Sequence, residues 1–394
     1  MLCLLLHIGL SCGTPLDKVE LMSSPFAAIC NDGSPYAYYV KTNAGSVNWV
    51  FFQMGGSYCW DQPTCTHRKQ TMGNLMTSKM LAPQVTINSG ILSDIPANNP
   101  LFAAWNRVLL PYCTSDAYSG NVSSSAWDVG LSFLGSRVLP AVVADLKAHY
   151  GLLNQPSSII VYSGASAGGV GIYPNVDRIS EELLPAAQVF GVVDSGWFLD
   201  STPFVPQQCV DDPNTCTDEQ IFSSGISAWG AIMDASCAAA TPVDIRWECL
   251  LGYRVLPYLS TPLFVFQWQF DLAQLTHDGV KGKPSTMPEL AYAQASAANL
   301  TKTITIAANA TSRHRFFSAS CYQHVVLNTK HQQAWITLTV NGVKLVDAIR
   351  DFVDGQGGNV SVRVDTCNTP DCNPTCPVLA LQHLSSEAAR RVSS

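Results

Sequence analysis

Five short runs of β-branched and aromatic residues constrain the fold of this chain more than any other feature. Each run is almost continuously apolar rather than alternating, which is typical of strands buried on both faces of a parallel sheet. The runs span residues 47–53, 107–110, 158–162, 188–193 and 262–268. Helix-like segments lie between them, and in residues 131–149 the apolar side chains recur close to every 3.6 positions. This alternation predicts an α/β fold with a mostly parallel central sheet and helices on both faces.

The composition indicates a large buried core. Of the 394 residues, 47% are apolar and only 13% are charged, against about 25% charged in an average soluble protein. No stretch after the N-terminus approaches the roughly 20 apolar residues of a membrane-spanning helix, so we expect no membrane span. The net charge of −7 without a dense basic run argues against a nucleic-acid partner. His67-Arg68-Lys69 is the nearest approach to a basic run, and we interpret it as a solvated turn.

Fourteen cysteines without iron–sulfur or zinc spacing indicate disulfides and an oxidising compartment. Three pairs would each close a short loop, and a fourth would join segments beside two predicted strands. In that order these are Cys59–Cys65, Cys209–Cys216, Cys237–Cys249 and Cys30–Cys113, which leaves Cys321, Cys367, Cys372 and Cys376. A metal-binding knuckle is the alternative for the last three cysteines. No histidine lies at ligand spacing, so we expect no metal and no other cofactor.

The N-terminus indicates export. Residues 1–13 contain an apolar run followed by small residues, as in a signal peptide, although a positively charged start is absent. Cleavage near Gly13 would remove Cys3 and Cys12 and leave an even number of cysteines. Four glycosylation sequons agree with secretion: Asn121, Asn299, Asn309 and Asn359. We therefore expect a secreted, extracellular glycoprotein.

One domain is expected over residues 14–384. Residues 201–258 break the alternation of strands and helices and carry four cysteines. We interpret them as a cysteine-stapled cap inserted over the strand ends. The last residues, 385–394, are expected to be a disordered tail.

Gly164-Ala165-Ser166-Ala167-Gly168 matches the G-x-S-x-G pattern and follows the third strand-like run. In this motif a sharp strand-to-helix turn lifts the serine hydroxyl above the sheet, and only small neighbours leave room for the turn. The N–H groups of the following helix lie near developing negative charge. The alternative is a glycine-rich turn without a catalytic role. The context predicts that Ser166 is a nucleophile.

A serine hydroxyl needs a histidine to accept its proton, and in α/β-hydrolases the partners follow in the order Ser, acid, His. Asp271 is the first candidate for the acid, because it follows the last strand-like run near the carboxyl end of the sheet. Asp194 is the second candidate and Asp200 the third. His324 is favoured as the base because Cys321 could anchor its loop. The other downstream histidines are His277, His314, His331 and His383.

The first strand-like run ends in Met54-Gly55-Gly56-Ser57-Tyr58-Cys59. Two glycines after an early strand suit a loop that binds an oxyanion, because side chains would keep the backbone N–H groups away from the tetrahedral oxygen. An ordinary Gly-Gly hairpin is the alternative. The position of this pair ahead of the G-x-S-x-G motif favours the catalytic interpretation.

From about residue 30 to residue 377 the sequence resembles the pectin acetylesterase and Notum family of secreted serine esterases. The segments common to the family are residues 90–93, 98–100, 105–106, the glycines before Tyr58-Cys59, and 166–169. Other segments are more similar to the Notum branch than to plant pectin acetylesterases. These are residues 111–116, 175–178, 194–200, 209–211, 252–255, 267–268, 271, 273–275 and 372–377.

The resemblance implies an α/β-hydrolase fold and a set of site residues. The implied triad is Ser166, Asp271 and His324, with oxyanion donors at the backbone N–H groups of Gly56, Ser57 and Ala167. The implied substrate-binding residues are Tyr58, Phe198, Leu250 and Leu251. Two positions depart from the Notum pattern: Ser57 replaces a tryptophan, and His277 replaces an apolar pocket residue.

The resemblance also implies an activity. Notum removes palmitoleate from a serine of Wnt proteins, and plant relatives remove acetyl groups from pectin. We therefore expect a secreted, monomeric carboxylesterase that removes a palmitoleoyl-type group from an extracellular protein. The alternatives are deacetylation of a cell-wall or matrix polysaccharide, and an inactive protein that binds an acyl group or a glycan.

Overall fold

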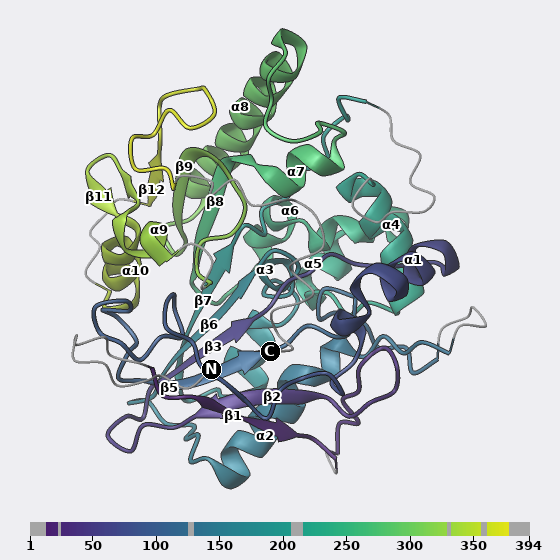
Figure 1. Cartoon of the computed structure of the whole chain (residues 1–394), viewed down its shortest axis with the longest axis vertical. Helices are drawn as coiled ribbons and strands as arrows, with labels where there is room; N and C mark the ends of the chain where they lie inside the picture. The colour runs from purple at the N-terminus through teal and green to yellow at the C-terminus, as the bar shows by residue number, and fades with distance from the viewer. Residues whose placement is uncertain are drawn as a thin grey trace, which may run out of the picture.

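The computed structural model describes residues 13–22, 25–124, 130–205, 216–328, 332–355 and 361–377. Within these residues ten strands form one sheet in the order β12-β9-β8-β7-β6-β3-β5-β2-β1-β4 (Figure 1). The predicted signal peptide, apart from Gly13, and the predicted tail lie outside the described residues.

All five predicted strands are present, and they form the parallel part of the sheet. They are β3 (Trp49–Gln53), β5 (Asn106–Leu110), β6 (Ile159–Ala165), β7 (Gln188–Asp194) and β8 (Leu263–Asp271). Two further strands, β9 (Arg315–Gln323) and β12 (Val362–Val364), extend it in parallel. Every residue of β3 and β8 is buried, which explains their continuous apolar character.

The other edge of the sheet is antiparallel. It consists of β2 (Ala37–Lys41), β1 (Leu16–Glu20) and β4 (Gln84–Val85). A separate two-stranded sheet joins β10 (Thr339–Val340) and β11 (Val343–Lys344). The predicted mostly parallel sheet is confirmed.

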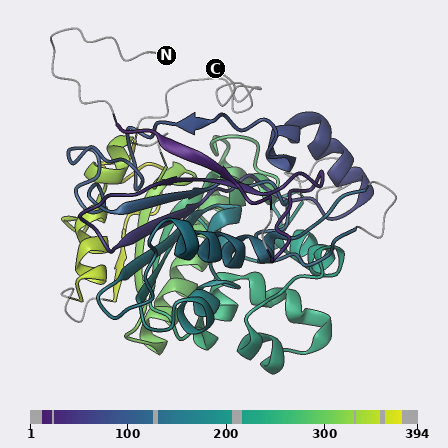
Figure 2. The ribbon, with the colours of Figure 1, turned by 90° about the horizontal axis from the view of Figure 1, so that it is seen from below.

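Alternate strand residues face two separate cores, so helices cover both faces of the sheet, as predicted. In β3, Trp49 and Phe51 pack into one core and Val50 and Phe52 into the other. The first core includes residues of α2 (Val138–His149) and α8 (Met287–Ala310). The second includes residues of α9 (Gln332–Thr337) and α10 (Leu345–Val353). Figure 2 shows helices on both sides of the strands.

The apolar periodicity predicts a helix from residue 131, but α2 begins only at Val138. Phe133 exchanges two backbone hydrogen bonds with Val122, so its peptide groups are committed to a β-bridge. A short 3₁₀ turn, η2 (Gly135–Arg137), then leads into α2.

Between β7 and β8 the described chain forms helices and 3₁₀ turns. They are α4 (Asp218–Trp229), α5 (Ala235–Ala240), η5 (Val243–Leu250), α6 (Gly252–Val255) and η6 (Leu256–Tyr258). This segment falls within the range predicted to be a cap. None of the described helices is long and apolar enough to cross a membrane.

Three of the predicted disulfides are present: Cys30–Cys113, Cys59–Cys65 and Cys237–Cys249. Cys216 is also disulfide-bonded, and its predicted partner Cys209 lies outside the described residues. The four cysteines left open pair as Cys321–Cys376 and Cys367–Cys372.

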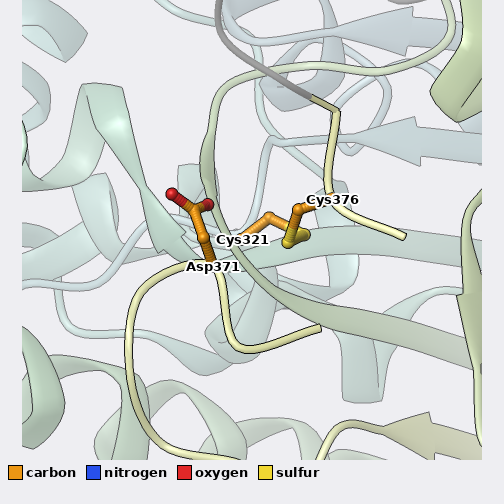
Figure 3. Close-up of side chains that lie close together, drawn as sticks. All are labelled: Cys321, Asp371 and Cys376. Atoms are coloured by element: carbon orange, nitrogen blue, oxygen red, sulfur yellow. A yellow bond between two sulfur atoms is a disulfide. The ribbon is translucent and has the colours of Figure 1, made fainter. Parts of the chain in front are cut away.

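These last two disulfides overturn the alternative of a metal knuckle, because their sulfurs are bonded to one another rather than free as thiolates. Figure 3 shows the Cys321–Cys376 bridge with the Asp371 carboxylate beside it. That carboxylate accepts hydrogen bonds from the Tyr322 backbone N–H, at 2.7 Å, and from Lys283 Nζ, at 2.5 Å. The cluster therefore ties the C-terminal segment to β9.

Candidate active site

Ser166 lies in the turn between β6 and the short helix α3 (Ala167–Val170). Its backbone has φ 56° and ψ −124°, a conformation that costs a non-glycine residue about 1–3 kcal/mol and that clusters at functional sites. The Ser166 backbone N–H is held by a 2.9 Å hydrogen bond to the Asp194 carbonyl. A Cβ on Gly164 would lie 2.3 Å from the Gly168 carbonyl oxygen, so the small residues of the motif make the turn possible.

Residues 54–59, which we name the Gly-Gly loop, lie directly against this turn. A Cβ on Gly55 would lie 2.7 Å from Ser166 Cβ and 2.4 Å from the Ala165 carbonyl oxygen, so only glycine fits there. The next two residues have positive φ, +148° at Gly56 and 61° at Ser57. The structure thus places the Gly-Gly loop against the turn that carries Ser166 and Ala167, and Gly56, Ser57 and Ala167 stay the predicted oxyanion donors.

Asp271 and His324 meet at the same edge of the sheet. Asp271 is the last residue of β8, and His324 directly follows β9, whose last residue Gln323 is in register with Asp271. His324 Nδ1 lies 3.0 Å from each Asp271 carboxylate oxygen. Because β6, β8 and β9 are parallel, the carboxyl ends that carry the serine, the acid and the histidine share one edge.

Asp271 is 3% exposed, and its orientation is fixed by hydrogen bonds besides the one to His324. Oδ1 accepts from the backbone N–H groups of Ala273 and Gln274 at the start of α7 (Leu272–His277), and Oδ2 accepts from Gln267 Nε2. The arrangement suits a buried anion that orients an imidazole.

The second candidate for the acid, Asp194, has a different role. Its Oδ2 accepts the backbone N–H groups of Val326 and Leu327, both at 2.7 Å, and Oδ1 accepts the Ser195 hydroxyl. Burial raises the pKa of Asp194 to about 6. Asp194 therefore holds the backbone of the segment that follows His324 in place. The third candidate, Asp200, accepts from the Tyr253 hydroxyl and pairs with Arg254.

The other described downstream histidines have structural partners. His314 Nδ1 accepts the Leu263 backbone N–H, and burial lowers the pKa of His314 to about 4. His277 Nδ1 lies 3.1 Å from Asp218 Oδ1. Burial opposes the charge of His277, but the carboxylates of Asp218, Asp278 and Asp271 together outweigh it and raise the pKa of His277. His331 and His383 lie outside the described residues.

The four residues implied as substrate-binding are all buried. The Phe198 ring lies between two imidazoles, with its centroid 5.8 Å from that of His277 and 6.3 Å from that of His324. The Tyr58 ring packs against Phe222 and Trp229 of α4. Leu250 and Leu251 are buried in the core that includes these aromatic residues.

The prediction that residues 67–69 form a solvated turn was wrong. These residues lie in α1 (Gln62–Met72), which begins with a capping box at Asp61. Thr64, Cys65 and Arg68 share its buried face, as residues four apart in a helix do. The Arg68 guanidinium donates from Nη1 to the Gly56 carbonyl oxygen at 2.6 Å. The sequence offered no local signal for this contact, because it depends on how α1 docks.

The family model for pectinacetylesterase matches residues 17–377. The chain belongs to this family. Palmitoleoyl-protein carboxylesterase notum1a of Danio rerio is 35% identical over 375 residues, covering 91% of this chain and 72% of the relative. Palmitoleoyl-protein carboxylesterase NOTUM of Homo sapiens is 35% identical over 375 residues, covering 91% of this chain and 73% of the relative.

A solved structure agrees with the sequence comparison. The Wnt deacylase Notum from Drosophila superposes with a TM-score of 0.82 at 31% identity, covering 92% of this chain and all of that chain. These similarities confirm the predicted family and the α/β-hydrolase-like fold. As a member of the pectinacetylesterase family, the chain is a carboxylic ester hydrolase.

Another buried carboxylate near the candidate site provides a test of pH-dependent stability. Asp278 follows α7, is fully buried, and accepts from Gln274 Nε2 at 3.1 Å. Burial, and then the Asp218 charge, raise the pKa of Asp278 from 3.8 to about 7. The folded state therefore binds an extra proton between about pH 4 and pH 7, so this group destabilises the fold as the pH rises through that window.

We expect Asp278→Asn to raise the free energy of unfolding at pH 8 by about 1–3 kcal/mol and to change it little at pH 4.5. Urea denaturation at the two pH values measures the difference. Asp354→Asn is the matched control, because Asp354 is exposed at the end of α10. A variant that is less stable than the wild type at pH 8 would contradict the assignment.

Proposed function

We propose that this chain is a secreted serine carboxylesterase that removes an O-linked acyl group from an extracellular substrate. The observation that supports it best is the convergence of the strained Ser166 turn, the Gly-Gly loop and the His324–Asp271 hydrogen bonds at one edge of the sheet. Ser166 is the nucleophile, His324 the general base and Asp271 the acid that orients the imidazole. Secretion agrees with the disulfides and with exposed sequon asparagines at 121, 299 and 309.

The geometry supports a two-step mechanism. His324 Nδ1 faces Asp271, so Nε2 is the nitrogen available to take the Ser166 proton. Ser166 Oγ forms a bond to the ester carbonyl carbon, and the backbone N–H groups of Gly56, Ser57 and Ala167 stabilise the resulting oxyanion. Collapse breaks the bond to the alcohol, which leaves with the proton from His324. Water then gives a proton to His324 and bonds to the acyl carbon. The bond from that carbon to Ser166 Oγ breaks, the acid leaves, and His324 returns the proton to Ser166.

The first candidate substrate is an extracellular protein with a palmitoleoyl-type ester. Its support is the set of relatives named palmitoleoyl-protein carboxylesterases, which match more than nine-tenths of this chain. A second candidate is an acetylated polysaccharide. The buried His277–Asp218 pair favours it, because this pair places a polar group one aromatic ring away from His324.

Chain-length preference tests the proposal. The purified chain is assayed with p-nitrophenyl esters of two, eight and sixteen carbons, with a serine-O-palmitoleoyl peptide and with acetylated pectin. Release of the fatty acid from the peptide and turnover of the longer esters support the first candidate. Turnover of acetate esters and pectin alone supports the second. Absence of turnover with all substrates would contradict the proposed function.

A further inference from the structure

Arg68 carries a guanidinium group that is fully buried below the Gly-Gly loop. Among the described residues, no carboxylate lies within ion-pair distance of it, although the buried Asp116 carboxylate favours its charge from farther away. A buried charge without a directly paired counter-ion costs several kcal/mol unless strong hydrogen bonds compensate it. The proposed mechanism gives Arg68 no role, so a further role must account for a charge at this position.

The contacts of Arg68 are directed at one peptide group of the loop. Nη1 donates to the Gly56 carbonyl oxygen at 2.6 Å, and Nε donates to Ser115 Oγ at 2.7 Å. The guanidinium carbon also lies 5.7 Å from the centroid of the Tyr112 ring. Nη2 has no hydrogen-bond partner in the described chain. One of its two hydrogen bonds therefore goes to Gly56, a residue of the predicted oxyanion loop.

The Gly56 carbonyl and the Ser57 N–H belong to the same planar trans peptide, so they point in opposite directions. A hydrogen bond that fixes the carbonyl oxygen thereby fixes the direction of the N–H. This matters because glycine at position 56 allows the peptide to adopt other orientations, and Ser57 has a φ of 61°. We infer that Arg68 is a positioning residue that aims the Ser57 N–H at the oxyanion formed on the Ser166 adduct.

The charge of Arg68 adds a second effect. A charged donor forms a stronger hydrogen bond than a neutral one, and it polarises the peptide that accepts it. The Ser57 N–H becomes a better donor for an oxyanion that appears only in the transition state. An interaction of this kind raises kcat without tightening substrate binding.

The surroundings hold Arg68 in place. Ser115, which accepts from Nε, donates to Asn31 Oδ1 at 2.6 Å, and Asn31 donates to two backbone carbonyl groups. The Cys59–Cys65 disulfide ties α1 to the Gly-Gly loop itself. The guanidinium therefore sits on a rigid support, as the positioning of a single peptide requires.

The test rests on the proposed function, so it starts from turnover of a p-nitrophenyl ester by the wild-type chain. We expect Arg68→Met to lower kcat about 10–100-fold, since loss of one oxyanion donor costs about 10²–10³ and here the donor is only misdirected. KM stays within about threefold of wild type. The inhibition constant of a trifluoromethyl ketone, which adds to the nucleophile and presents an oxyanion, rises by the same factor as kcat/KM falls.

Arg107→Met is the matched control. Arg107 is also buried, donates to the Leu92 carbonyl and pairs with Asp94, but it lies at the amino end of β5, away from the candidate site. This variant is expected to lose thermal stability as R68M does and to keep kcat within about threefold. Arg68→Lys keeps the charge and one donor, and we expect its kcat and inhibition constant to fall between those of R68M and wild type.

The outcomes distinguish a failure of the role inferred for Arg68 from a failure of the proposed function. Equal kcat losses in R68M and R107M, or a kcat loss in R68M with an unchanged inhibition constant, would overturn the role of Arg68. If R68M does not fold, R68K carries the test through the same two measurements. A wild-type chain that hydrolyses no ester contradicts the proposed function instead, and leaves no kcat loss to attribute to Arg68.

Discussion

Ser166→Ala lowers the turnover of short p-nitrophenyl esters by about 10⁴-fold or more, according to the proposed mechanism. Alanine has no atom that can form the bond to the ester carbonyl, and His324 then has no hydroxyl to deprotonate. The fold is expected to remain intact, because the Ser166 backbone N–H still bonds to the Asp194 carbonyl and alanine fits wherever serine does. Initial rates and a thermal melt of the same preparation measure the two effects.

A second serine of the same strand provides the control. Ser163 is buried three residues earlier in β6 and donates its hydroxyl to the Phe51 carbonyl. Ser163→Ala removes a buried hydroxyl without touching the candidate site, so kcat should stay within about threefold of wild type. A fluorophosphonate probe should label the wild type and S163A but not S166A. Unchanged turnover in S166A would exclude Ser166 as the nucleophile.

Five of the seven parallel strands were predicted, because burial on both faces leaves a direct record in the sequence. The parallel strands β9 and β12 were not predicted. β8, for example, is buried at all nine positions, and a short, continuous run of aromatic and β-branched residues is typical of such a strand. The antiparallel edge was not predicted, although β2 is buried at four of its five positions. In β1 only Leu16 is buried, and β4 has two residues, so neither carries a periodic pattern. Pairing across a sheet edge is specified by partners distant in the chain rather than by local composition.

In the candidate site, too, some residues could be predicted from the sequence and others could not. Ser166 was predictable because its motif is contiguous in the sequence. Glycine at 164 is required by a contact four residues away, with Gly168, whereas glycine at 168 is required by the backbone of Gln53 and Met54. Asp271 and His324 could be ranked only by chain order and neighbouring strands, and their roles remain predictions. Arg68 could not be found at all, since nothing in a helix sequence says that one basic residue docks under a loop twelve residues earlier.

The second large effect on activity is expected when the proposed acid, Asp271, is replaced. We expect Asp271→Asn to lower kcat/KM about 10³–10⁴-fold. The Asn amide group can donate to His324 Nδ1, which would place the imidazole proton on Nε2 and prevent that nitrogen from accepting the Ser166 proton. The Asn oxygen can still accept the two backbone N–H groups at the start of α7, so the local fold is retained at a cost of about 1 kcal/mol for the altered contact with Gln267.

Asp194→Asn is the matched comparison, because Asp194 is buried like Asp271 and lies at the end of the neighbouring strand β7. Its oxygens hold the backbone of Val326 and Leu327 rather than the imidazole, and an amide oxygen can still accept those N–H groups. We expect D194N to lose less than about tenfold in kcat/KM. A larger loss in D194N than in D271N would reverse the assignment. Asp194 would then be the acid of the triad, and the hydrogen bonds between Asp271 and His324 would serve only to anchor the histidine to α7.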